Sequence, residues 1–262
     1  MTAPLHTDRA DLTDRALSFS SAAAQYAANR PSYPPALLEA IEAMAGRPLA
    51  GARVADIGAG TGIATALLHA RGADVVAVEP GDGMAEQFRR ALPEVPVVRG
   101  DGNSLPLATA SVDFLTYAQS WHWTDPERSI PEAVRVLRPG GALVLWWNAA
   151  ALDVPWIDAQ TDRVQRYFGL ERTAGRNGDG THAVLAGPTD PLDFARGQVR
   201  WSRRVPLDTH LANIGSHSIF LVHGAEKAAA FLDEERSHLL TVFPDGMVEE
   251  TYDVAFLLAV RP

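Results

Sequence analysis

A run of glycines is the strongest chemical signal in the sequence. It lies in VADIGAGTG, residues 54–62, where a strand of buried character passes directly into glycines and then into a helix. Glycine lets a ligand approach the backbone closely, and the helix N-terminus offers free N–H groups. The spacing is not that of a dinucleotide site, because Ile63 stands where another glycine would be needed. No Lys-Ser or Lys-Thr pair follows, as a phosphate-binding P-loop requires.

Three carboxylates extend this signal, one at the end of each successive predicted strand. Asp56 lies just before the glycines and suits an ammonium group better than a pyrophosphate. Glu79 is placed to accept bonds from both hydroxyls of a ribose. Asp101 is placed to accept a hydrogen bond from the exocyclic amine of an adenine, with Met84 beside the adenine ring. Asp101 could instead be a turn residue. The set predicts a cofactor with an amino acid, a ribose and an adenine but no phosphate. S-adenosylmethionine fits this description.

Aromatic residues follow directly after the fourth predicted strand. The faces of Trp121 and Trp123 could hold a sulfonium by cation–π attraction and exclude water, or both rings could simply pack beneath a cap. His122 between them is the candidate catalytic residue, as a general base, although many methyl transfers need no base. His217 and His182 are further pocket candidates.

Composition narrows the classes of function. The chain has 262 residues, a formal net charge of −9 and no cysteine, with 47% hydrophobic and 21% charged residues. The length suits one large domain or a core with a cap. The negative charge argues against nucleic acid, so we expect a small-molecule partner.

The absence of cysteine excludes disulfides and thiolate catalysis, and no metal-binding spacing is found. With neither a secretory signal nor a spanning segment, we expect no membrane partner and a cytoplasmic location. The oligomeric state stays open.

Arginines gather after the predicted core. They could bind substrate carboxylates, or they could form solvated faces of a helix and an edge strand. The residues are Arg163, Arg166, Arg172, Arg176, Arg196, Arg200, Arg203 and Arg204.

Short apolar runs alternate with segments of helical length through the core. The predicted strands are residues 52–58, 73–80, 95–101, 111–119 and 142–148. The predicted helices are residues 61–71, 82–92 and 126–137, the last stopped by Pro139-Gly140-Gly141. Strands that are almost wholly apolar are typical of a parallel sheet buried on both faces. The fold class is therefore α/β with a doubly wound sheet.

The whole chain, residues 1–262, is predicted to be one domain. Its parts are an N-terminal helical lid at 13–46, a cofactor-binding core at 52–148, a cap inserted after the fifth strand at 149–197, and closing strands and helices at 198–262. Within these parts we expect helices at 18–30, 36–45, near Leu211 and at 225–242, and strands at 198–207 and 250–262.

The same motifs resemble the class I S-adenosylmethionine-dependent methyltransferases of the small-molecule type (methyltransferase type 11). The resemblance rests on VADIGAGTG, VAVEP, GDGNSLP, SVDFLTYAQSWHW and RVLRPGGALV. With FSSAAAQYAANRPSYP and QSWHWTD, the chain is similar to the branch of trans-aconitate-methyltransferase-like and ubiquinone/menaquinone-biosynthesis-like enzymes. The resemblance implies a Rossmann-like sheet of seven strands in the order 3-2-1-4-5-7-6. Gly102 departs from the alanine that is common in the family, which predicts a more flexible loop.

The resemblance also implies the residues of the site. It implies cofactor contacts from Asp56, Gly58, Gly60, Glu79, Asp101 and the helix that carries Tyr26 and Arg30. The guanidinium of Arg30 would grip the methionine carboxylate, unless it is a solvated arginine before a proline turn. Further candidates for cofactor binding are Ala59, Thr61, Pro80, Met84, Gly102, Asn103 and Gln119. Candidates for substrate binding are Tyr33, Trp121, Trp146, Trp147 and His217.

The predicted function is S-adenosylmethionine-dependent transfer of a methyl group to O, N or C of a small molecule. One alternative is a nicotinamide-dependent oxidoreductase, which would explain the sheet and Glu79 but not Ile63 or Asp56. The other is a non-catalytic S-adenosylmethionine-binding module, which would keep the cofactor residues and lack turnover.

Overall fold

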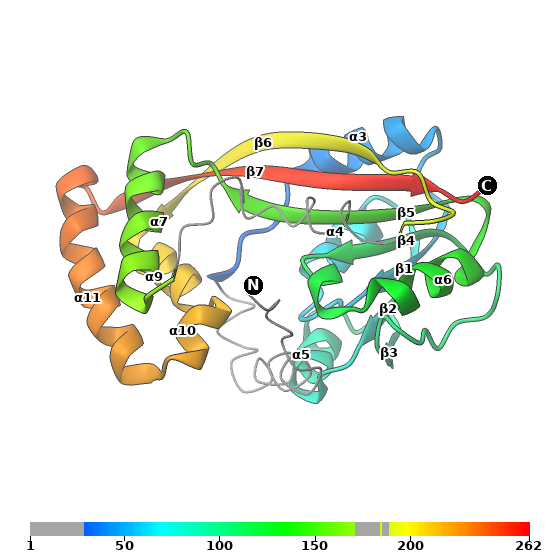
Figure 1. The fold of residues 1–262 in the computed structure, drawn as a ribbon, viewed down its shortest axis with the longest axis horizontal. Coiled ribbons are helices and arrows are strands. Elements are labelled where there is room, and N and C mark those ends of the chain that lie inside the picture. The colour runs from blue at the N-terminus through cyan, green and yellow to red at the C-terminus, as the bar shows by residue number, and fades with distance from the viewer. Residues whose placement is uncertain (1–28, 171–183, 185–188) are drawn as a thin grey trace, which may run out of the picture.

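A twisted sheet of seven strands forms the centre of the protein in the computed structural model, which describes residues 29–170, 184 and 189–262 (Figure 1). The strand order is β3-β2-β1-β4-β5-β7-β6, which confirms the order predicted above. Neighbours from β3 to β5 pair in parallel, whereas β7 is antiparallel to both β5 and β6. The strands are β1 (Arg53–Ile57), β2 (Asp74–Glu79), β3 (Val97–Arg99), β4 (Val112–Ala118), β5 (Leu137–Ala150), β6 (Ala195–Pro206) and β7 (Met247–Val260).

Helices cover both faces of the sheet and one of its ends. They are α3 (Pro35–Ala45), α4 (Ile63–Ala70), α5 (Asp82–Ala91), α6 (Pro126–Val136), α7 (Pro155–Phe168), α9 (Leu207–Gly215), α10 (Ser218–Val222) and α11 (Ala225–Val242), with a 3₁₀ turn η2 (Trp121–Trp123). One apolar core joins α3, α4 and α5 to the sheet, and a second joins α6 to the opposite face. The arrangement is the doubly wound one that the sequence predicts. No helix in the part of the chain described here is long and apolar enough to cross a bilayer.

The cap lies beyond the carboxyl ends of the parallel strands. There β5, β6 and β7 extend past the rest of the sheet and carry α7, α9, α10 and α11 (Figure 1). These helices share a separate apolar core formed by Phe168, Leu207, Leu211, Ile214, Phe220, Phe231, Leu239 and Val248. The cap is therefore larger than the expected insertion at 149–197, since the helices between β6 and β7 belong to it. Those helices pack there because their apolar residues contact Phe168 of α7 and Val248 of β7.

The N-terminal lid is described only in part. Residues 13–28 lie outside the described chain, so the helix expected at 18–30 and Tyr26 stay predictions. Helix α3, which the prediction includes in the lid, instead packs on the sheet with Leu37, Leu38 and Ile41 buried. Its limits follow from local chemistry, because it begins with a proline and ends at Gly46 with a left-handed φ of 65°.

The fifth strand begins earlier than the sequence predicts. The preceding helix ends at Val136, and Pro139-Gly140-Gly141 lies inside β5 rather than before it. Pairing with the end of the chain explains the difference, since Gly140 N–H donates to the carbonyl of Arg261 and Arg261 N–H donates to that of Gly141. The long-range strand partner outweighs the local turn signal.

Gly197 of β6 allows the ring of a core phenylalanine to lie against the backbone. A Cβ at this position would be 2.1 Å from Cζ of Phe256, whose ring is buried in the core and cannot move aside. We expect Gly197→Ala to lower the free energy of unfolding by about 1 to 3 kcal/mol through overpacking. Urea unfolding measures this, with Gln198→Ala, at the exposed neighbouring position, as the control. Equal stability of both variants would contradict the packing described here.

Candidate functional site

The glycine turn connects β1 to α4 at the carboxyl edge of the sheet. Gly58 has a φ of 64°, and a Cβ there would lie 2.6 Å from Cβ of Ser120, so only glycine fits. Gly60 also has a left-handed φ, 58°, but a Cβ there would meet no atom within 4 Å. The turn is thus closed against Ser120 on one side and open at Gly60 on the other, as a ligand would require.

A pocket opens at this turn. Its lining residues come from the segment before α3, the glycine turn and the end of β4; they are Arg30, Pro31, Tyr33, Gly58, Ala59, Gly60, Thr61, Ile63, Ala64, Ala118 and Gln119. Seven of the residues singled out from the sequence therefore meet at one place: Arg30, Tyr33, Gly58, Ala59, Gly60, Thr61 and Gln119. Pro31, Ile63, Ala64 and Ala118 also line it, and adjacency to the motif was the signal that could have found them.

One feature of this pocket favours a polar ligand, and a second shows that its backbone is constrained. Within the described chain, the buried hydroxyl oxygen of Thr61 has no hydrogen-bond partner, and a buried polar group of that kind normally needs one. Gln119 holds a φ of 60°, an uncommon value for a residue with a side chain. Its N–H donates to the carbonyl of Trp146 at 2.9 Å, so β5 holds this backbone in place.

Asp56 turns into the interior and does not line the pocket. Its carboxylate has no exposed surface and accepts hydroxyl bonds from Thr65 at 2.6 Å and Thr116 at 2.8 Å. Burial raises its pKa to about 6, while the two hydroxyl bonds act in the opposite direction. In this geometry no surface of the carboxylate is exposed, and the ammonium contact expected from the sequence stays a prediction. Asp56 joins β1 to the first turn of α4 and to β4.

Glu79 holds the glycine turn from the neighbouring strand. One carboxylate oxygen accepts the N–H of Gly60 at 2.8 Å, and the other accepts the N–H of Gly81 at 2.7 Å. The side chain is almost fully buried, and this burial raises its pKa, while the two N–H bonds lower it. Glu79 thus lies beside the glycine turn and does not itself line the pocket, and its contact with a ribose stays a prediction.

The third carboxylate lies on an exposed turn. Asp101 accepts the N–H of Asn103 at 2.7 Å, which is the turn geometry given above as its alternative role. The Asn103 side chain in turn accepts the N–H of Asp125 at 2.7 Å. Between them, a Cβ on Gly102 would lie 2.7 Å from the Thr124 methyl group. Close packing therefore accounts for this glycine, and the greater loop flexibility inferred from the family resemblance stays a prediction.

Two further cofactor candidates lie near Glu79 in the chain. Met84 is buried on α5, and the carbonyl of Pro80 accepts a bond from Arg99. Neither residue lines the pocket described above.

The aromatic candidates divide between the core and the surface. Trp121 is buried edge-on to Tyr117, with ring centroids 4.8 Å apart, and Trp146 and Trp147 are buried in the two opposite cores. His122 is exposed and lies 4.5 Å from the ring of Trp123. The surrounding protein lowers the pKa of His122 by removing part of its hydration, and its exposure to solvent limits this shift.

None of these aromatic residues lines the pocket, and neither does His217, which is exposed before α10. His182 lies outside the described residues. Tyr33 alone connects the pocket to this group, since its ring is edge-on to that of Trp146 at 5.8 Å. Of the residues predicted to contact the methyl group and substrate, Tyr33 therefore lines the pocket at the glycine turn, and the other described ones do not.

Comparison with known proteins identifies the fold and the chemistry. Residues 55–145 match the family described as a methyltransferase domain. Over 228 residues the chain is 39% identical to an uncharacterized methyltransferase of Mycobacterium tuberculosis, covering 87% of this chain and 88% of that protein. The chain belongs to the methyltransferase family. A solved structure from Anaeromyxobacter dehalogenans, assigned as a type II methyltransferase, shares 27% identity with a TM-score of 0.61, covering 88% of this methyltransferase and 96% of that chain. Demethylmenaquinone methyltransferase of Clavibacter sepedonicus is 39% identical over 102 residues, which is 37% of this chain and 42% of that protein.

The buried carboxyl of Asp56 makes the stability of this methyltransferase depend on pH. Because its pKa is raised from 3.8 to about 6 on folding, its stabilising contribution is complete below pH 4 and is lost as pH rises through 6. One pKa unit equals about 1.4 kcal/mol, so the contribution changes by about 3 kcal/mol across this window. Asp56→Asn removes this titrating carboxyl group, because the amide of asparagine does not ionise. Urea unfolding at pH 4, 5, 6 and 7 should show the variant gaining stability relative to the parent as pH rises. A difference that stays constant with pH would show that Asp56 keeps its ordinary pKa.

Proposed function

We propose that this methyltransferase uses S-adenosylmethionine and methylates a small molecule held between the core and the cap. The observation that carries the proposal is the pocket itself, where the glycine turn and Arg30 meet the hydroxyl of Thr61, which has no partner among the described residues. A phosphate-rich cofactor is disfavoured by the carboxylate of Glu79, which bonds directly to Gly60 N–H at this turn. The residues present therefore fit an amino acid and a ribose.

Each part of the cofactor would have its own group of residues. Arg30, Thr61 and the glycine turn would hold the amino acid end, where a guanidinium suits a carboxylate. Glu79 would accept the ribose hydroxyls. Asp101 and the apolar side chain of Met84 would face the adenine, as the sequence predicts. Asp56 would act through the turn, because its side chain has no exposed surface and is held by two threonine hydroxyls.

When held by Arg30, Thr61 and the glycine turn, S-adenosylmethionine would supply an electrophilic methyl group for a nucleophilic atom of the substrate, and its sulfur would keep the electron pair of the bond that is broken. The protein orients the two reactants and excludes water, which lowers the barrier by removing the need to bring them together from solution. The proton that the nucleophile loses passes to His122 or to solvent. Because the surrounding protein lowers its pKa, His122 would be neutral at pH 7 and ready to accept it.

The substrate class follows from the charge and the surroundings of the site. A net charge of −9 disfavours polyanions such as nucleic acids, and buried aromatic side chains next to the pocket favour a small, partly apolar acceptor. The similarity to demethylmenaquinone methyltransferase agrees with this class but covers only 37% of the chain. Membership of the trans-aconitate-methyltransferase-like branch stays a prediction.

Calorimetric titration with S-adenosylmethionine and with NADH separates this proposal from the oxidoreductase. We expect the first to bind and the second not to bind. Transfer of a labelled methyl group from S-adenosylmethionine to members of a small-molecule library then separates an enzyme from a module that only binds. Tight NADH binding with no binding of S-adenosylmethionine would overturn the proposal.

Glu79→Gln tests the ribose contact. Hydrogen bonds to a charged acceptor contribute about 1.5 to 3 kcal/mol, so the affinity for S-adenosylmethionine should fall about 10- to 100-fold. The matched control is Glu86→Gln, because Glu86 is an exposed residue of α5 that pairs only with Arg90 among the contacts described. Circular dichroism confirms that both variants fold. An affinity within a factor of two of the parent would exclude Glu79 from the cofactor site.

His122→Asn tests the general base. If His122 accepts the proton, turnover with an acceptor found in the library should fall by about 100-fold while cofactor affinity stays the same. In the parent, the rate should fall as pH drops through a pKa below 6.5, because the protonated ring cannot act as a base. The variant should lack this inflection. His69→Asn, at an exposed position on α4, is the control. An inflection that persists in the variant would assign proton transfer to another group or to solvent.

A further inference from the structure

The short segment 29–33, which forms one wall of the pocket, is fastened to the cap and the extended sheet. Nη2 of Arg203 on β6 donates to the carbonyl of Asn29 at 3.2 Å. Arg30 donates to the carbonyl of Ser216, just after α9, at 3.3 Å. Farther along, the side chain of Asn148 on β5 donates to the carbonyl of Ser32 at 3.3 Å. Elements distant in the chain therefore determine where Arg30 lies.

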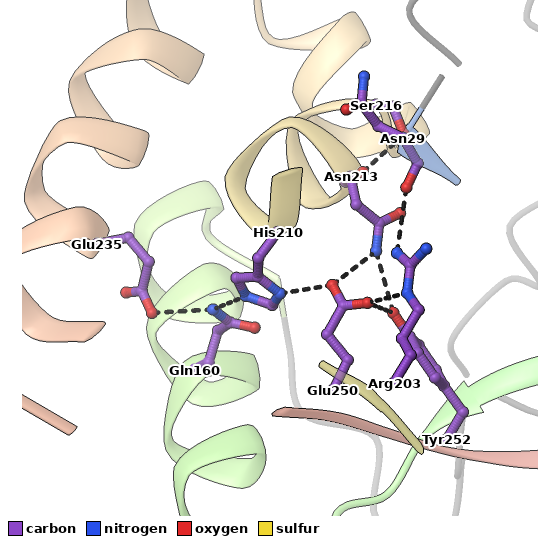
Figure 2. Close-up of polar contacts among 9 residues, drawn as sticks. All are labelled: Asn29, Gln160, Arg203, His210, Asn213, Ser216, Glu235, Glu250 and Tyr252. Carbon is purple, nitrogen blue, oxygen red and sulfur yellow. Dashed lines mark hydrogen bonds and ion pairs between the residues drawn. The ribbon is translucent and has the colours of Figure 1, made fainter. Parts of the chain in front are cut away.

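The buried carboxylate of Glu250 is connected to two of these contacts through further hydrogen bonds (Figure 2). Glu250 on β7 is 2% exposed and accepts a bond from Nε of Arg203 at 2.6 Å. It also accepts from the side-chain amide of Asn213 at 3.3 Å, and the carbonyl of Asn213 accepts the hydroxyl of Ser216 at 2.6 Å. Arg203 is hydrogen-bonded to Asn29, and Ser216 is hydrogen-bonded to Arg30. Two chains of hydrogen bonds therefore connect Glu250 to neighbouring residues of segment 29–33.

Other groups complete the shell of this carboxylate. Tyr252 donates its hydroxyl at 2.8 Å, and Nδ1 of His210 lies 2.7 Å away. Burial alone would raise the pKa of Glu250, but the bond from His210 and the charge of Arg203 outweigh it and lower the pKa. A paired, hydrogen-bonded carboxylate in the interior is rigid, since any displacement would leave a buried charge unsatisfied.

The same network has a second arm that leads away from the pocket. Gln160 on α7 contacts Nε2 of His210 at 2.9 Å and donates to Glu235 on α11 at 3.1 Å. Glu235 is 1% exposed and is paired with Arg163 through two bonds of 2.6 Å. Glu235 is thus a buried, arginine-paired glutamate like Glu250, but none of its described partners contacts segment 29–33. It provides a matched control.

We propose that Glu250 is a positioning residue for cofactor binding, which holds Arg30 in place for the carboxylate of the methyl donor through Arg203 and through Asn213 and Ser216. The inference rests on the proposed function, and it adds that a residue of the cap side of the sheet sets the affinity for the amino acid end of the cofactor. The reason is geometric. A guanidinium contributes a strong carboxylate contact only when its backbone and its fork are held in one orientation.

Two ligands that differ only in the part of interest provide the test. S-adenosylhomocysteine carries the amino acid, whereas 5′-methylthioadenosine has the same adenosine and a neutral thioether sulfur but no carboxylate or ammonium. The ratio of their affinities, measured by calorimetry, reports the amino acid contacts and cancels general effects on the adenosine site. Arg30→Gln in the parent background sets the size of the effect that loss of the guanidinium produces.

Glu250→Gln should lower the affinity for S-adenosylhomocysteine about tenfold and change that for 5′-methylthioadenosine by less than a factor of two. Arg203→Gln should change the ratio in the same direction, and it decides the question if Glu250→Gln does not fold. Glu235→Gln should lower the melting temperature without changing the ratio. Combining Arg30→Gln with Glu250→Gln should lower the ratio no further than Arg30→Gln alone.

An unchanged ratio in a folded Glu250→Gln variant would overturn the inference, as would an equal change in Glu235→Gln, which would indicate loosening of the whole cap. A parent that binds neither ligand would overturn the proposed function itself. A parent that binds both ligands with equal affinity would leave a cofactor site without an Arg30 contact and would overturn only the positioning role.

Discussion

A carboxylate with no exposed surface, that of Asp56, lies where the strands of the sheet meet the glycine turn. Moving a charge out of water is costly, so this position is tolerated only because two threonine hydroxyls satisfy it and because its proton is held more tightly. Thr116 belongs to β4 and Thr65 to α4. The direction of α4, and with it the face that the turn presents to a ligand, depends on this contact.

Glu79 on the next strand is also a buried carboxylate whose oxygens are satisfied by hydrogen bonds, but it lies beside the glycine turn. Its two oxygens hold backbone N–H groups on both sides, at Gly60 and at Gly81. The carboxylate is therefore fixed in direction by the backbone on both sides. A site whose polar groups are already oriented loses less conformational freedom on binding. The turn and its acidic neighbour form one preorganised unit rather than a flexible loop beside an acid.

The parallel strands of the core and the glycine turn could be predicted from the residues themselves, because they depend on local apolar periodicity and on glycines with a steric purpose. The strand order and the place of Arg30 in the site came instead from the family resemblance, since local periodicity does not determine which strands pair. The sequence could not predict which way Asp56 points, since strand position fixes a side chain's face but not its partners. The extent of β5 was missed because its partner Arg261 lies at the far end of the chain. The network around Glu250 was also beyond prediction, because Arg203 and Glu250 are brought together only by the pairing of β6 with β7.

The strands β5 and β7 each have 14 residues and run without a break from the core into the cap. Continuous ladders of hydrogen bonds pair them from Ala142 with Val260 to Ala150 with Tyr252. A two-lobed enzyme usually opens by bending at a few loop residues between its lobes, and this sheet places no such loop between them. Rotation of the cap would have to bend the paired strands themselves. Each such rotation would strain the ladder of hydrogen bonds between β5 and β7, so these two strands resist opening of the cap as a rigid body.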